Sequence, residues 1–217
     1  MRPIKGGALL LAAVALLALA GCSDKQEKAD NPGGAIIRSS QDPNGLRGAT
    51  LDQPYSMPAT TLTDTGGNPF NLVTSTKKPV TLVFFGYTNC PDVCPTTMAD
   101  IHNALLKVPA AVQQRTYVVF VSTDVKRDTG PVLTQWLHNF DGGVAATFVG
   151  LRGTQAQIDA AQAAAHILVA EDGGQTHSTQ VLLYGPDDYA RVSYVYSGGD
   201  GNEAAQMAHD LPIVAKS

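Results

Sequence analysis

The stretch that decides the fold is residues 80–98, which read Val-Thr-Leu-Val-Phe-Phe-Gly-Tyr-Thr-Asn-Cys-Pro-Asp-Val-Cys-Pro-Thr-Thr-Met. Residues 80–85 form an almost continuous apolar run, which is typical of a strand buried on both faces. Residues 86–94 form a loop. A helix is expected from Pro95 to about residue 107, because proline is favoured in the first turn of a helix. Ligand and redox sites are common in loops of this kind, which follow the carboxyl end of a strand in an α/β sheet.

The rest of the chain continues this alternation of strands and helices. It predicts an α/β fold with a central mixed sheet flanked by helices and an N-terminal hairpin. The expected strands are residues 60–63 and 69–72, joined by a turn at 64–68, and residues 117–121, 147–149, 167–170, 179–184 and 189–196. The expected helices are residues 131–140, capped by Asp128, residues 155–165, capped by Thr154, and a last helix that begins at Asn202 and ends near residue 214.

Composition narrows the classes of function. The chain has 217 residues, of which 44% are hydrophobic and 16% charged, and its formal net charge is −4. These values fit one domain with a sizeable core and exclude a disordered chain. No run rich in Lys and Arg occurs, so no nucleic-acid partner is expected.

The N-terminus has the pattern of an export signal. Arg2 and Lys5 precede residues 8–20, an unbroken apolar run that is too short to span a bilayer. The run ends in Leu19-Ala20-Gly21-Cys22, which resembles a bacterial lipobox. We therefore expect residues 1–21 to be a lipoprotein signal peptide and Cys22 to be lipidated. Residues 22–50 are then a flexible tether and residues 51–217 an extracytoplasmic domain anchored to the cell membrane.

Two cysteines remain for chemistry, Cys90 and Cys94. Two thiols in an oxidising compartment can form a structural disulfide, a redox couple or part of a metal site. Three residues separate them, whereas thioredoxin-type motifs have two, and the chain has no second cysteine pair of the kind that zinc ribbons need. Pro95 disfavours helical geometry at Cys94, which is therefore expected just before the helix, where the helix N-terminus favours its thiolate.

A third metal ligand would come from a histidine, and His177 is the best candidate. It lies in a glycine-rich loop directly before an expected strand. Two thiolates and one imidazole would make a trigonal site for Cu(I) or Cu(II), and zinc with a bound water is equally compatible with this set. Surface or packing roles are expected for the other four histidines, His102, His138, His166 and His209.

Three stretches resemble the signatures of the Sco/SenC family of copper-binding, thioredoxin-fold proteins. Residues 84–97, Phe-Phe-Gly-Tyr-Thr-Asn-Cys-Pro-Asp-Val-Cys-Pro-Thr-Thr, resemble the first signature. Residues 121–129, Val-Ser-Thr-Asp-Val-Lys-Arg-Asp-Thr, resemble the second. His177-Ser178 followed by Tyr184-Gly-Pro-Asp187 resembles the third.

This resemblance implies a thioredoxin-like fold and a copper site made by Cys90, Cys94 and His177. It also implies a metallochaperone that delivers copper to the dinuclear copper centre of cytochrome c oxidase during its assembly. The implied partners are the copper-bearing subunit of that oxidase and an upstream copper donor or thiol reductant. Two positions depart from the family pattern: Val125 replaces the usual Pro of a turn, and Thr176 replaces an Asp that often precedes the histidine and can orient its ring.

Other functions use the same cysteines. A thiol–disulfide oxidoreductase would reduce the cysteines of the oxidase copper centre with the Cys90/Cys94 couple and would not need His177. A peroxidase is not expected, because the peroxiredoxin pattern Pro-x-x-x-Thr-x-x-Cys fails at Tyr87 and Pro91. The remaining alternative is an exported domain with one inert disulfide.

Overall fold

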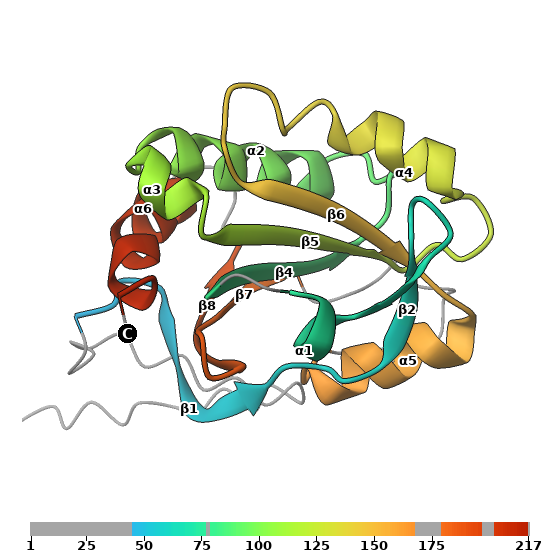
Figure 1. The fold of residues 1–217 in the computed structure, drawn as a ribbon, viewed down its shortest axis with the longest axis horizontal. Helices are drawn as coiled ribbons and strands as arrows, with labels where there is room; N and C mark the ends of the chain where they lie inside the picture. The colour runs from blue at the N-terminus through green and yellow to red at the C-terminus, as the bar shows by residue number, and fades with distance from the viewer. Residues whose placement is uncertain (1–44, 77–78, 168–178, 197–201, 217) are drawn as a thin grey trace, which may run out of the picture. The chain divides into compact units, whose positions relative to one another are not determined.

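The computed structural model describes residues 45–76, 79–167, 179–196 and 202–216. Strands and helices alternate along them (Figure 1). In chain order the elements are β1 (Ala49–Ser56), β2 (Thr61–Asp64), β3 (Pro69–Asn71), α1 (Leu72–Ser75), β4 (Val80–Gly86), α2 (Val93–Leu106), α3 (Ala110–Gln113), β5 (Thr116–Ser122), α4 (Gly130–Leu137), β6 (Thr147–Arg152), α5 (Gln155–Ala164), β7 (Gln180–Tyr184), β8 (Tyr189–Val195) and α6 (Asn202–Val214).

The strands of the described residues form one mixed sheet of eight strands in the order β1-β8-β7-β4-β5-β6-β2-β3. Strands β4, β5 and β6 are parallel, and β7 pairs antiparallel with the other side of β4. At one edge β8 and β1 continue antiparallel, and at the other β2 pairs antiparallel with both β6 and β3. All seven residues of β4 are buried, as the apolar run predicted. The expected mixed sheet flanked by helices is confirmed.

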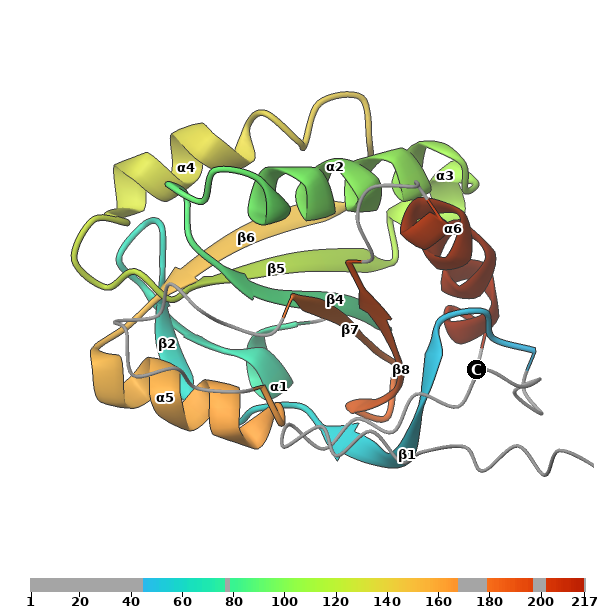
Figure 2. The same cartoon turned by 180° about the vertical axis from the view of Figure 1, so that it is seen from behind.

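Each face of the sheet has its own apolar core, because successive side chains of a strand point to opposite faces. On one face Phe84 of β4 packs with Met98 of α2 and Met207 of α6. On the other face Phe85 packs with Ile158 of α5. Figures 1 and 2 show the same division, with α2 and α4 on one side of the sheet and α1 and α5 on the other. The central strand β4 is therefore covered on both faces, and only its ends are open to functional groups.

Strand β1 was not expected from the sequence, and the tether boundary expected at residue 50 falls inside it. Ala49 and Thr50 already pair with β8. The sequence pattern of β1 does not predict a strand, because the segment has many polar residues and contains Pro54. Its register with β8 is interrupted between Thr50 and Tyr55, and such a break at a sheet edge tolerates a proline that cannot donate a hydrogen bond.

One local expectation at a helix start is wrong and another is confirmed. Asp128 does not cap α4: the N-cap is Thr129, and the Asp128 carboxylate turns instead toward the loop that follows β4. Thr154 does cap α5 as expected, in a capping box with Gln157. Of the edge strand expected over residues 167–170, only Ile167 lies within the described residues, where it is buried and belongs to no strand.

Candidate functional site

The two cysteines lie at the junction of β4 and α2, where the parallel part of the sheet ends. Helix α2 begins at Val93, so Cys94 occupies its first turn and does not precede it as expected. Pro95 fits there, since the first backbone N–H groups of a helix have no partner within the helix. Cys90 is half-buried, Cys94 is fully buried, and both side chains are in the thiol form.

Hydrogen bonds fix the two sulfurs relative to each other. The backbone N–H of Cys94 donates to Cys90 Sγ over 3.3 Å. The N–H of Cys90 donates to the carbonyl of Tyr87 over 3.3 Å, which closes a turn over residues 87–90. The sulfur of Cys90 therefore faces the N-terminus of α2, where backbone N–H groups stabilise a thiolate.

The pKa values of the two thiols move in opposite directions. Burial alone would raise the pKa of Cys90, but the backbone N–H groups of Cys94 and Asp92 outweigh it, and the pKa lies below its ordinary value. Burial raises the pKa of Cys94 far above its ordinary value. The expectation that the helix N-terminus would favour the thiolate at Cys94 is therefore wrong. Cys90 is the more ionisable thiol, because it is partly open to solvent and its sulfur accepts backbone N–H groups, whereas Cys94 is fully buried.

Gly86, the last residue of β4, makes room for the buried sulfur. A methyl group on its Cα would lie 3.0 Å from Cys94 Sγ and 2.9 Å from Cε2 of Phe120. The carbonyl of Gly86 accepts the N–H of Thr123 over 2.7 Å, which ties the end of β4 to the end of β5. The sheet thus holds the backbone against which the first turn of α2 packs.

His177 lies outside the described residues, as do Cys22 and Thr176. The residues that follow this segment are nevertheless described, from Thr179 into β7. Strand β7 begins at Gln180 and runs antiparallel to β4, with Val181 paired to Phe84. The start of β7 therefore lies beside the end of β4, from which the cysteine loop emerges.

The other four histidines make contacts that suit structural roles. Nδ1 of His102 lies 2.7 Å from the carbonyl of Phe140, and the ring of His166 stacks on Tyr55 with centroids 4.2 Å apart. His138 and His209 each lie 2.8 Å from a neighbouring carboxylate. Val125, the departure from the family pattern that the structure describes, begins a turn after β5 and packs against the core.

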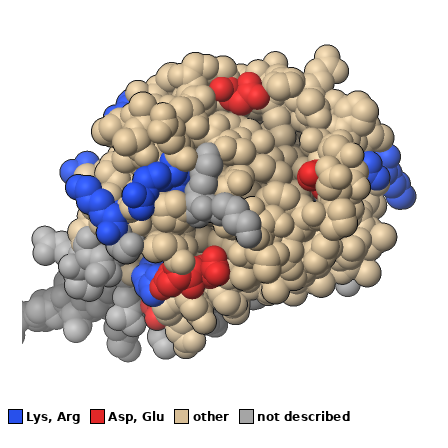
Figure 3. Space-filling view, viewed as in Figure 1, with Lys and Arg blue, Asp and Glu red and all other residues tan. Residues whose placement is uncertain are grey.

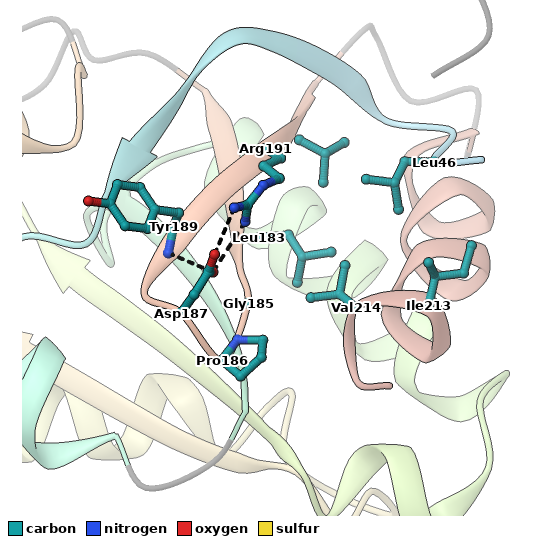
Figure 4. A pocket seen from close by; sticks show the side chains of 10 residues that line it. Leu46, Leu183, Gly185, Pro186, Asp187, Tyr189, Arg191, Ile213 and Val214 are labelled. Carbon is teal, nitrogen blue, oxygen red and sulfur yellow. Dashed lines mark hydrogen bonds and ion pairs between the residues drawn. The ribbon is translucent and has the colours of Figure 1, made fainter. Parts of the chain in front are cut away.

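A groove of about 410 Å³ lies away from the thiols, between the β7–β8 turn, the end of α6 and the approach to β1 (Figure 4). Leu183 and Val214 line it, and the ion pair of Asp187 with Arg191, 2.7 Å long, lies at its wall. Neither cysteine lines this groove. The chemistry of the thiol pair is therefore separate from it.

Surface and membrane features of the described residues add little to this site. The face seen in Figure 3 is mostly uncharged, and its Lys and Arg side chains lie toward opposite ends. Among the residues with a described placement, none of the helices has the length and apolar character to cross a membrane.

Within the described part of the chain, no group of three or more His, Cys, Asp and Glu side chains is arranged to hold a metal ion. The described residues thus provide two sulfur donors at the junction of β4 and α2.

Comparisons with known proteins point to one family. A family model described as SCO1/SenC matches residues 49–212. A relative from Stutzerimonas stutzeri that is named as a copper-binding protein is 30% identical over 147 residues, which cover 65% of this chain and 70% of that protein. Protein SenC of Rhodobacter capsulatus is 38% identical over 135 residues, which cover 55% of this chain and 59% of SenC.

A solved structure extends the likeness to the fold. Apo Sco1 from Thermus thermophilus superposes with a TM-score of 0.62 at 26% sequence identity, covering 82% of this chain and 98% of that one. The thioredoxin-like fold implied by the sequence resemblance is confirmed.

Proposed function

Because this chain belongs to the SCO1/SenC family, we propose that it binds one copper ion through Cys90, Cys94 and His177. Copper is the metal named for the Stutzerimonas stutzeri relative, and a copper-bound structure exists for a family member with 27% identity to this chain. The observation that carries the proposal is the pair of thiols held together at the β4–α2 junction by the hydrogen bond from Cys94 N–H to Cys90 Sγ.

The donor chemistry suits copper. Two thiolates are soft ligands that favour Cu(I), and an imidazole allows Cu(II) to be held as well. The lowered pKa of Cys90 favours its thiolate, which is the form that binds a metal. The raised pKa of Cys94 keeps its thiol protonated in the protein without copper. Copper binding must therefore release the proton of Cys94, so the affinity for copper should rise with pH.

The connectivity supports His177 as the third ligand. Consecutive Cα atoms are 3.8 Å apart, so the Cα atom of His177 lies at most about 7.6 Å from that of Thr179. Thr179 precedes β7, whose first residues lie beside the end of β4. An imidazole at residue 177 is thus within reach of the cysteine loop.

We further propose that the protein is a metallochaperone. Proteins of this family take part in copper handling and in the assembly of cytochrome c oxidase. The chain would pass copper by ligand exchange to the dinuclear copper centre in the copper-bearing subunit of that oxidase. An upstream donor would load it. Cys90 is the group from which exchange would begin, because it is the thiol that is partly open to solvent.

Lipidation of Cys22 would keep the chaperone at the membrane that holds its target. The backbone N–H of Arg47 donates to the buried carboxylate of Asp210, so the chain is tied to the folded domain at this point. Between Cys22 and Arg47 an extended chain spans at most about 90 Å. This reach allows the copper site to meet a membrane-bound partner.

A second function is favoured by the asymmetry of the two thiols. Cys90 is half-buried with a lowered pKa, which suits an attacking thiolate, and Cys94 is buried next to it. Cys90 would attack a disulfide of the target and form a mixed disulfide. Cys94, after losing its proton, would attack Cys90 Sγ, which releases the reduced target and leaves a Cys90–Cys94 disulfide. Two electrons pass from the protein to the target.

One experiment separates these two functions. The copper-bearing domain of the oxidase subunit is prepared both reduced without copper and oxidised to its disulfide. The first form is mixed with the Cu(I)-loaded protein and the second with the reduced protein. We expect copper to pass to the reduced domain and the His177→Ala variant to fail in this transfer. Reduction of the oxidised domain by wild type and His177→Ala alike, without transfer of copper, would favour the oxidoreductase.

A further inference from the structure

Asp128 is a buried carboxylate that lies next to the cysteine loop. It is 2% exposed and belongs to the loop between β5 and α4. Its Oδ1 accepts the hydroxyl of Thr88 over 2.6 Å, and its Oδ2 accepts the backbone N–H of Thr88 over 3.0 Å. Oδ2 also accepts the hydroxyl of Ser122 over 2.6 Å. Three donors thus converge on one carboxylate, and hydrogen bonds to an ionised acceptor are the stronger kind.

The carboxylate is itself held by the end of β5. The backbone N–H of Asp128 donates to the carbonyl of Asp124 over 3.1 Å, and the N–H of Asp124 donates to the hydroxyl of Ser122 over 3.1 Å. Ser122 is the last residue of β5 and is buried. The position of Asp128 is therefore set by the sheet.

Thr88 connects this frame to the reactive sulfur. It is the second residue of the turn over residues 87–90, which the hydrogen bond from Cys90 N–H to the carbonyl of Tyr87 closes. Asp128 binds both the backbone and the side chain of Thr88, so it restricts the conformation of the turn. Within the turn itself, the N–H of Cys90 closes the loop on Tyr87 and the N–H of Cys94 donates to Cys90 Sγ, so Asp128 adds a hold on the turn from a different part of the chain.

We propose that Asp128 is a positioning residue, which holds Cys90 through Thr88 in the orientation that copper binding uses. The inference rests on the proposed copper site. It assigns the task of preorganising the ligand Cys90 to a residue that is 40 positions from Thr88 in the sequence. Groups that orient metal ligands typically change metal affinity by about 10–100-fold when they are removed.

The test compares matched variants of the reduced protein in a Cu(I) competition titration. Asp128→Ala removes the acceptor, and Thr88→Val removes the hydroxyl while keeping the shape of the side chain. Both should weaken Cu(I) binding by about 10–100-fold. Thr88→Ser restores the hydroxyl and should bind as wild type does. Asp210→Ala is the control. It also removes a fully buried carboxylate that accepts hydrogen bonds, but this carboxylate belongs to α6 and binds the hydroxyl of Tyr194.

A second readout does not depend on copper. If Asp128 positions Cys90, Thr88→Val changes the rate at which Cys90 is alkylated in the folded protein, and Thr88→Ser restores that rate. Wild-type affinity for Cu(I) in both Thr88→Val and Asp128→Ala would overturn the proposal, and so would an equal loss in Asp210→Ala. If wild type itself binds no Cu(I), the proposed function fails, and the alkylation rates still decide whether Asp128 positions Cys90: a rate unchanged by Thr88→Val would then overturn the inference.

Discussion

The packing of Gly86 against Cys94 and Phe120 predicts the effect of a single methyl group. In Gly86→Ala the new carbon would lie 2.9 Å from Phe120 Cε2 and 3.0 Å from Cys94 Sγ, distances at which a neighbour has to move. Phe120 and Cys94 are both fully buried. The ring of Phe120 also packs on Trp136 with centroids 4.6 Å apart, so it has little room to withdraw.

The cost follows from overpacking a filled core. Inserting a methylene-sized group into such a site usually lowers the free energy of unfolding by about 1–3 kcal/mol. Gly142→Ala is the matched control, because a methyl group there would meet no atom within 4 Å. Replacing a loop glycine by alanine at such a site changes the free energy of unfolding by less than about 1 kcal/mol, in the stabilising direction.

Equilibrium urea unfolding of the reduced proteins measures both changes. The single tryptophan, Trp136, packs on Phe120, so its fluorescence reports on the part of the core that Gly86→Ala disturbs. We expect Gly86→Ala to unfold at lower urea concentration than wild type and Gly142→Ala to unfold at the same concentration or higher. A Gly86→Ala protein within about 0.5 kcal/mol of wild type would refute the steric argument.

Three further outcomes follow from the same structure. Iodoacetamide should modify Cys90 before Cys94 in the folded, reduced protein. The backbone N–H groups at the sulfur of Cys90 outweigh its burial and lower its pKa, while burial raises the pKa of Cys94. Equal rates of modification, measured by mass mapping, would contradict this. Burial also raises the pKa values of Tyr184 and Tyr194, so above about pH 9 the unfolded chain loses these protons and that of Cys94 before the folded protein does. The free energy of unfolding should then fall by up to about 1.4 kcal/mol per pH unit for each group, and urea titrations that give a flat profile up to about pH 11 would count against it. Asp210→Ala should lower the free energy of unfolding by roughly 3 kcal/mol, since it leaves the buried hydroxyl of Tyr194 and two backbone N–H groups without their acceptor; unchanged urea unfolding would be evidence against these bonds.

Local patterns predicted the centre of the fold well. The apolar run at residues 80–85 gave β4, because a strand covered on both faces needs apolar side chains at every position. Thr154 and Gln157 gave the start of α5, because both halves of a capping box lie within one turn. In each case the residues that decide the structure are close together in sequence.

The state of the thiols depends on residues that are distant in sequence. Cys94 is buried because α2 packs against the end of β4, where Phe120 of β5 closes the space beside Gly86. Sequence spacing around the cysteines cannot reveal this burial, and the expected thiolate at Cys94 was therefore wrong. Pro95 favours an extended conformation at Cys94, but this preference was likewise overridden, since α2 begins at Val93, the residue before Cys94.

The role inferred for Asp128 was hidden by a competing local pattern. An aspartate shortly before an apolar helix is typical of an N-cap, and Thr129 takes that position instead. The true partner of Asp128 is Thr88, which the parallel pairing of β4 and β5 brings alongside. The pattern that could have found it is the occurrence of polar residues just after two adjacent parallel strands, whose carboxyl ends meet at one edge of the sheet.

The central claim is that Cys90, Cys94 and His177 together bind one copper ion. A competition titration of Cu(I) with the reduced wild-type protein, His177→Ala and His138→Ala tests it most directly. His138 is the control, because it is an exposed histidine whose ring contacts Asp141. We expect one Cu(I) per chain in wild type and in His138→Ala, and markedly weaker binding in His177→Ala. Binding that is the same in all three proteins would contradict the three-ligand site.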